Sequence, residues 1–118
     1  MKNIILSSVT IVSLFLANIV AALTVNNLSK YPISVGYSVC KTNGQCTSAR
    51  PTIGAANSSN NRINILTSAS DTFKISSALE LDPNGKIIAQ LNQPCSFKSV
   101  TQVFLNDNGT SKITCSAG

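Results

Sequence analysis

The sequence contains no histidine and no tryptophan, and only four of its 118 residues are acidic. Histidine is the commonest general base near neutral pH and the usual partner of a serine or cysteine nucleophile. Its absence therefore excludes the catalytic residue sets that hydrolases use most often. Aromatic residues make up 5% of the chain, and the cations are spread along it rather than clustered between aromatic side chains. This pattern argues against nucleic acid as a partner.

The few carboxylates form no recognisable catalytic or metal site. Asp82 and Asp107 lie in turn sequences, where they have a structural role. Glu80 and Asp82 stand two residues apart on a predicted strand, so they would share one face and could mimic a glycosidase pair. Two solvated residues on an outer face are the simpler interpretation. We expect no catalytic residues, no metal, no cofactor and no enzymatic activity.

Residues 1–22 have the three parts of a secretory signal peptide: a basic Lys2, a long apolar run and the small pair Ala21-Ala22. The predicted cleavage point is before Leu23. An uncleaved membrane anchor is the alternative, because residues 3–29 carry no charge and are numerous enough to span a bilayer. The run is diluted by hydroxyls and lacks a basic stop-transfer cluster, which favours the signal peptide. We therefore predict a secreted or periplasmic protein with no membrane span after cleavage, folded as one domain over residues 23–118.

Four cysteines remain after cleavage: Cys40, Cys46, Cys95 and Cys115. Their spacing does not suit zinc, and export places them in an oxidising compartment, so two disulfides are predicted. The Asn43-Gly44 turn favours Cys40–Cys46, which leaves Cys95–Cys115.

A regular hairpin around residues 106–109 would conflict with that second bridge. It would set Val100 opposite Cys115 and leave Cys95 roughly 16 Å away at the rise of a strand. A disulfide needs Cα atoms within about 7 Å. Either the chain bends between Cys95 and Val100, or the pairs cross as Cys40–Cys95 and Cys46–Cys115.

The rest of the chain alternates apolar and polar residues with period two, which predicts strands with one buried face. In residues 73–81 the alternation places Phe73 and Leu81 inward and Glu80 outward. Turn sequences such as Asp82-Pro83-Asn84-Gly85 separate the strands. The segment 95–105 is irregular and indicates either burial on both faces or a bulge near Ser99. The fold class is therefore all-β, a small antiparallel β-sandwich of seven or eight strands with a small barrel as the alternative. The predicted strands cover residues 23–28, 33–39, 62–66, 73–81, 86–91, 100–105 and 112–115.

Residues 50–61 are rich in small and polar residues and form the longest stretch without a strand pattern. Loops on a rigid sheet often carry binding residues, so Arg50, Asn57, Asn60 and Arg62 are the candidate contact residues. A mobile solvated connection is the alternative.

We expect a non-catalytic binding or interaction protein whose partner is a protein or a component of the cell envelope or cell surface. An inhibitor of a secreted hydrolase, of protease or lysozyme type, is the alternative. The basic surface is either solvated or weakly attracted to an anionic surface such as an acidic glycan. Asn27, Asn57 and Asn108 match the N-glycosylation acceptor pattern.

Overall fold

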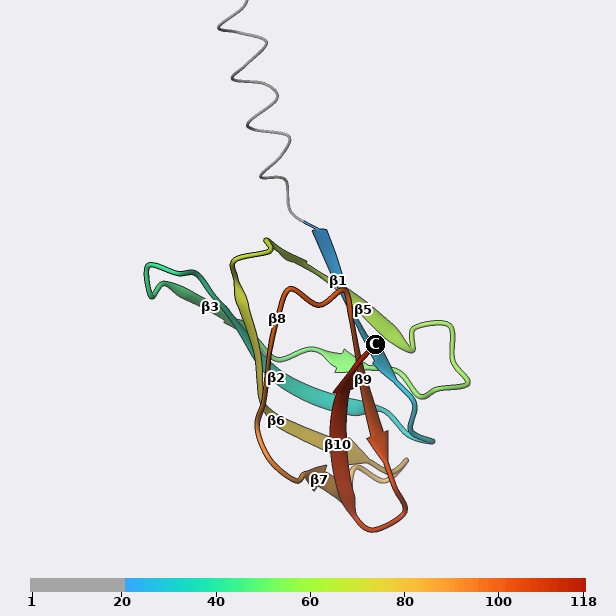
Figure 1. Ribbon diagram of the computed structural model, residues 1–118. Helices are drawn as coiled ribbons and strands as arrows, with labels where there is room; N and C mark the ends of the chain where they lie inside the picture. The colour runs from blue at the N-terminus through green and yellow to red at the C-terminus, as the bar shows by residue number, and fades with distance from the viewer. Residues whose placement is uncertain (1–20) are drawn as a thin grey trace, which may run out of the picture.

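The computed structural model describes residues 21–118, so nearly all of the predicted signal peptide lies outside the described residues. Ten β-strands and no helix are found in this part of the chain (Figure 1). The strands are β1 (Ala21–Asn27), β2 (Ile33–Cys40), β3 (Cys46–Ala49), β4 (Thr52–Ile53), β5 (Arg62–Thr67), β6 (Thr72–Leu81), β7 (Ile87–Leu91), β8 (Cys95–Lys98), β9 (Gln102–Asp107) and β10 (Lys112–Ala117).

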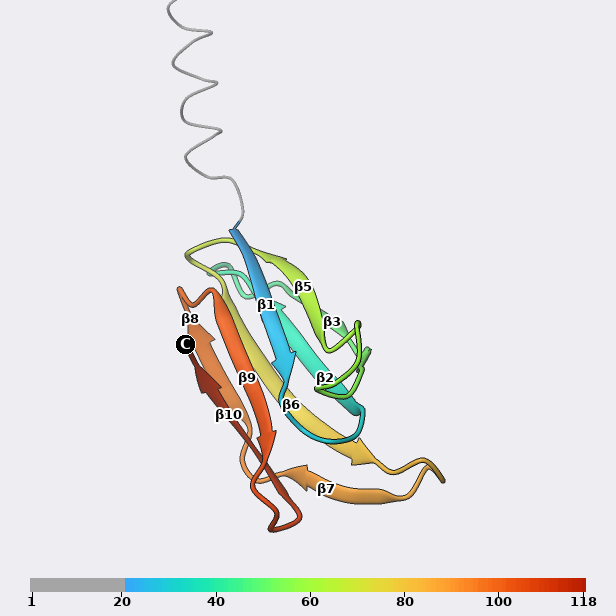
Figure 2. The ribbon, with the colours of Figure 1, turned by 90° about the vertical axis from the view of Figure 1, so that its right-hand side faces the viewer.

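All ten strands belong to one hydrogen-bonded sheet with the order β3-β2-β6-β7-β10-β9-β1-β5; β4 pairs with β2, and β8 pairs with β6. The sheet curls, so that β1, β9 and β5 face β2 and β6 across the core (Figure 2). The predicted all-β fold is confirmed. The structure adds two parallel pairings, β1 with β9 and β7 with β10, which make the sheet mixed. The additional strands β3 and β4 are four and two residues long, too short for an alternating pattern to show, and the irregular segment 95–105 divides near Ser99 into β8 and β9.

The core lies between the two halves of the curled sheet. It takes alternate residues from most strands, including Val25 of β1, Val35 of β2 and Leu105 of β9, all fully buried. Ile53 of β4 is also fully buried, although it belongs to the stretch expected to be a loop. Each such side chain removed from water stabilises the fold by roughly 1.5–3 kcal/mol.

A β-bulge in β6 changes which residues face the core. Gly36 of β2 pairs with Ser77 while the next residue, Tyr37, pairs with Ile75, so Ser76 is an extra residue in β6. One inserted residue reverses the alternation that follows it. The prediction that Glu80 is solvated on the outer face is therefore wrong, because Glu80 is only 1% exposed.

The disulfides are Cys40–Cys46 and Cys95–Cys115, so the local pairing is confirmed and the crossed pairing is wrong. The conflict over Cys95 disappears because the chain bends. β8 ends at Lys98, Ser99 has a φ of 59°, and β9 begins at Gln102. β9 and β10 form an antiparallel hairpin in which Cys115 pairs with Leu105 and not with Val100, and residues 108–111 connect the two strands. The second disulfide therefore ties β8, on the edge of β6, to β10.

The N-terminal strand begins before the predicted cleavage point. Ala21 and Ala22 already pair with Thr67 and Leu66 of β5. Cleavage before Leu23 would thus remove two paired residues of β1 and leave the other five strand residues in place. Residues 21–118 hold no helix that is long and apolar enough to cross a membrane.

Candidate functional site

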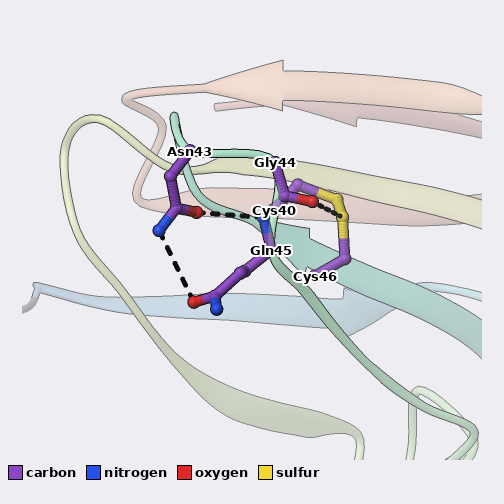
Figure 3. The surroundings of a disulfide bond; sticks show 5 residues. All are labelled: Cys40, Asn43, Gly44, Gln45 and Cys46. Carbon is purple, nitrogen blue, oxygen red and sulfur yellow. Dashed lines mark hydrogen bonds between the residues drawn. A yellow bond between two sulfur atoms is a disulfide. The ribbon is translucent and has the colours of Figure 1, made fainter.

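The hairpin formed by β2 and β3 projects from the body of the molecule (Figure 1). Cys40 and Cys46 are direct partners in the ladder, with their Cα atoms 4.0 Å apart, so the disulfide closes the hairpin at its tip. Within the tip, the Asn43 Oδ1 accepts the N–H of Gln45 at 2.9 Å (Figure 3). Gly44 has a φ of 91°, a conformation that favours glycine. The tip is consequently rigid, although residues 41–50 are all exposed.

The outer face of β3, β2, β6 and β8 carries a row of hydroxyls and cations. Ser38 pairs with Ser48 on one side and with Lys74 on the other, and Lys74 pairs with Ser96. Residues directly opposite each other in a sheet point to the same face, and the neighbours of Ser38 and Lys74 along their strands face the core. Lys98 lies two residues beyond Ser96 and shares this face. We call this surface, formed by Ser38, Ser48, Arg50, Lys74, Ser96 and Lys98, the basic serine face.

An open groove of about 410 Å³ lies at one side of this face. Gly36 contributes to its lining together with Arg50. A Cβ on Gly36 would lie 3.4 Å from the Arg50 guanidinium nitrogen Nη2 and would collide with the Ser77 Oγ. Glycine at this position therefore accommodates the Ser77 hydroxyl, whereas the guanidinium would be at an ordinary van der Waals distance from a Cβ. The other lining residues are Tyr37, Ser38, Ser48, Ala49 and Ser76.

The two serine hydroxyls of the bulge differ in their hydrogen bonds. The Ser76 Oγ donates to the Gly36 carbonyl at 3.3 Å. The Ser77 Oγ is buried and has no hydrogen-bond partner within residues 21–118. The bulge thus brings two hydroxyls beside Gly36, and one of them keeps its hydrogen-bonding capacity unused.

No carboxylate lies on the basic serine face. Glu80 is buried inside, Asp71 precedes β6, Asp82 follows it, and Asp107 ends β9. Across residues 21–118, Arg50 forms no ion pair with a carboxylate. The face is therefore a positively charged surface rich in hydroxyl donors and acceptors.

The four predicted contact residues are all exposed, but they do not form one surface. Arg50 lines the groove, whereas Asn57 and Asn60 belong to residues 54–61, on the side of the molecule opposite β3 in Figure 1. Arg62 opens β5. Only Arg50 thus joins the basic serine face, which the sequence did not reveal because the face is assembled across four strands.

Residues 54–61 are held by their own hydrogen bonds. The Gly54 N–H donates to the Asn60 carbonyl, and the Ala56 N–H donates to the Ser29 carbonyl, both at 2.9 Å. The Asn27 Nδ2 donates to the Gly54 carbonyl at 3.0 Å. Asn27 is 1% exposed, so the folded chain does not present it to a glycosylating enzyme. Asn57 and Asn108 are exposed.

Glu80 is buried in β6, whereas Asp82 follows the end of that strand and is partly exposed in the turn. The Asp82 Oδ1 accepts the N–H groups of Asn84 and Lys86, each at 2.9 Å, which fixes the turn. Burial raises the pKa of Glu80 to about 7, with further contributions from a hydrogen bond with Asp107 and the negative charge of Asp107. The Tyr31 N–H, which donates to the Glu80 Oε2 at 3.3 Å, opposes this rise. The arrangement that suggested a glycosidase pair is therefore absent from the described residues.

A second cavity, of about 200 Å³, lies at the end of the molecule where β1 begins. Leu23, Phe73, Phe97 and Val100 form its apolar lining. Asp71 lies at the same cavity, and its Oδ2 accepts the N–H of Ser68 at 2.9 Å. This hydrogen bond lowers the pKa of Asp71. Within residues 21–118 no group of three or more metal-ligating side chains is found.

Comparison with known proteins leaves the family open. No family model matches the sequence, and no curated protein matches it. Among solved structures, the fold is similar to an NMR structure of a protein from Eubacterium rectale, with 13% identity and a TM-score of 0.47. The match covers 83% of this chain and 87% of that chain. The functional proposal therefore depends on the residues of this chain alone.

Proposed function

We propose that this protein is a non-catalytic binding protein of the extracytoplasmic space and that its basic serine face binds an acidic glycan. Two disulfides are consistent with an oxidising compartment. The observation that supports the ligand is the presence of Arg50, Lys74 and Lys98 on one hydroxyl-rich face without a carboxylate. Arginine and serine together match the chemistry of a uronate, whose carboxylate accepts charge-assisted hydrogen bonds and whose hydroxyls pair with serine.

The test is binding of the oxidised protein to soluble polygalacturonate, with dextran as a neutral polymer of similar hydroxyl content. Arg50→Ala is expected to weaken binding about tenfold, because a hydrogen bond to a charged group contributes about 1.5–3 kcal/mol. Lys112→Ala is the matched control: it removes one exposed charge from β10, away from the basic serine face. Binding should also weaken with added salt.

Three outcomes would contradict the proposal. Equal affinity for dextran and polygalacturonate would show that charge does not contribute to binding. Equal losses of affinity in the Arg50 and Lys112 variants would show that only the net charge of the protein matters. Failure to bind polygalacturonate at low ionic strength would exclude an acidic glycan as the ligand.

The projecting hairpin supports the second candidate, an inhibitor of a secreted hydrolase. Such an inhibitor needs a rigid loop that reaches an active site, and residues 41–45 are exposed beside the Cys40–Cys46 disulfide. A panel of secreted proteases and lysozymes tests this candidate. Inhibition that is lost when Lys41 is replaced by alanine would favour it, and inertness against the whole panel would reject it.

A further inference from the structure

The sheet ends in two edge strands, β3 and β5, and β5 (Arg62–Thr67) is the longer. β5 pairs with β1 on one side, and no strand within residues 21–118 pairs with its other side. An open strand edge presents a row of N–H and C=O groups that can pair with a further strand. The edge of β5 is therefore a candidate interaction surface, separate from the basic serine face.

The register identifies the backbone groups that point outward. The Asn27 N–H donates to the Asn61 carbonyl at 2.9 Å, so these two residues form a hydrogen-bonded pair. Bonded and non-bonded pairs alternate along an antiparallel ladder. Arg62, Asn64 and Leu66 consequently lie in non-bonded pairs and direct their backbone groups away from β1. Thr24, opposite Asn64, agrees with this assignment, because its N–H donates to Thr101 on the side of β9.

Apart from the charge of Arg62 at its start, β5 lacks the devices that usually protect an edge. Natural edge strands are commonly blunted by proline, bulges or inward-pointing charges. The pairing of β5 with β1 runs without interruption, and the strand contains no proline. Its inward residue Ile65 is buried, while Leu66 is 77% exposed, the highest value among the exposed large hydrophobic residues of the described chain.

We propose that the β5 edge is a strand-addition site for an extended segment of a partner protein. The partner segment has an apolar side chain beside Leu66 and an acidic side chain beside Arg62. Only an extended chain can match outward N–H and C=O groups at this spacing. Arg62 is exposed and forms no ion pair within residues 21–118, which supplies the charge complementarity.

A second copy of the chain fits this edge less well. In a two-fold antiparallel pairing centred on Asn64, Arg62 of each copy would face Leu66 of the other, so no charge would be matched. Both copies would also carry the same positive net charge.

The experiment uses a synthetic peptide of alternating valine and threonine with one aspartate near its end. Asn64→Pro and Asn64→Ala both remove the hydrogen bond that Thr24 Oγ1 donates to Asn64 Oδ1 at 3.0 Å. Only the proline variant also removes the outward N–H. We expect the alanine variant to bind as the unmodified protein does and the proline variant to bind at least tenfold more weakly. On binding, hydrogen exchange should slow at the amides of Arg62, Asn64 and Leu66.

The site would be overturned by absence of peptide binding, by equal binding to the proline variant, or by slowed exchange at other strands only. Self-association that the proline variant abolishes would assign the edge to a second copy instead. Leu66→Ser is a further variant for the case in which the proline chain does not fold. It alters an exposed side chain and is expected to weaken peptide binding without disturbing the core.

Discussion

At the scale of single residues, Glu80 is a carboxylic acid enclosed by the core and close to a second carboxylate. The ordinary pKa is 4.5, and burial with Asp107 nearby raises it to about 7. The Glu80 Oε1 has no acceptor role within residues 21–118, while its Oε2 accepts the Tyr31 N–H. Burial and the nearby negative charge of Asp107 both favour the protonated form of Glu80. Glu80 is thus neutral in the folded protein at mildly acidic pH.

This protonation makes stability depend on pH in a defined direction. Below pH 4.5 Glu80 is protonated in both the folded and the unfolded chain. Between pH 4.5 and about 7 the unfolded chain releases the proton and the folded chain keeps it, so the free energy of unfolding falls as pH rises. We expect a decrease on the order of 1–3 kcal/mol in urea denaturation across this range. The chain has no histidine, whose titration would otherwise overlap.

Glu80→Gln is the matched variant, because it keeps the shape and is neutral at every pH. It should lose the pH dependence in this window and be more stable than the unmodified protein near pH 8, where Glu80 is ionised. A profile that has the same slope in both proteins would show that another group titrates.

At the scale of elements, the bulge in β6 and Gly36 in β2 form one local unit. Alanine at position 36 would place its Cβ against the Ser77 Oγ and near the Arg50 guanidinium. We expect Gly36→Ala to lower the free energy of unfolding by about 1–3 kcal/mol through overpacking.

The double variant Gly36→Ala with Ser77→Ala tests whether the contact with the Ser77 hydroxyl causes this loss of stability. Removing the Ser77 hydroxyl relieves the contact, and by itself it should be neutral or slightly stabilising because this buried group has no hydrogen-bond partner within residues 21–118. Recovery of stability in the double variant, measured by urea denaturation, supports this account. An equally unstable double variant would locate the strain elsewhere.

The same bulge shows where the sequence was sufficient and where it was not. The strands with unbroken alternation, such as β2 and β10, could be predicted from period two alone. The burial of Glu80 could not, because the extra residue Ser76 becomes visible only when β6 is paired with β2. The basic serine face is similar: its members Arg50, Lys74 and Lys98 are distant in sequence and become neighbours only through pairing.

At the scale of the whole molecule, the two disulfides have different reach. Cys40–Cys46 closes a separation of 6 residues within one hairpin, whereas Cys95–Cys115 closes 20 residues and joins β8 to β10. Chain entropy predicts that the bond with the longer loop constrains the unfolded state more. Replacing Cys95 and Cys115 by serine should lower the free energy of unfolding by about 3 kcal/mol, and replacing Cys40 and Cys46 should lower it by about 2 kcal/mol.

Thermal unfolding of the two double variants beside the oxidised protein measures which disulfide stabilises the fold more. The hairpin variant should keep the exchange protection of the core strands, whereas the other should lose protection in β8 and β10. The reverse order of melting temperatures would mean that the projecting hairpin, and not the link between β8 and β10, limits the cooperativity of the fold.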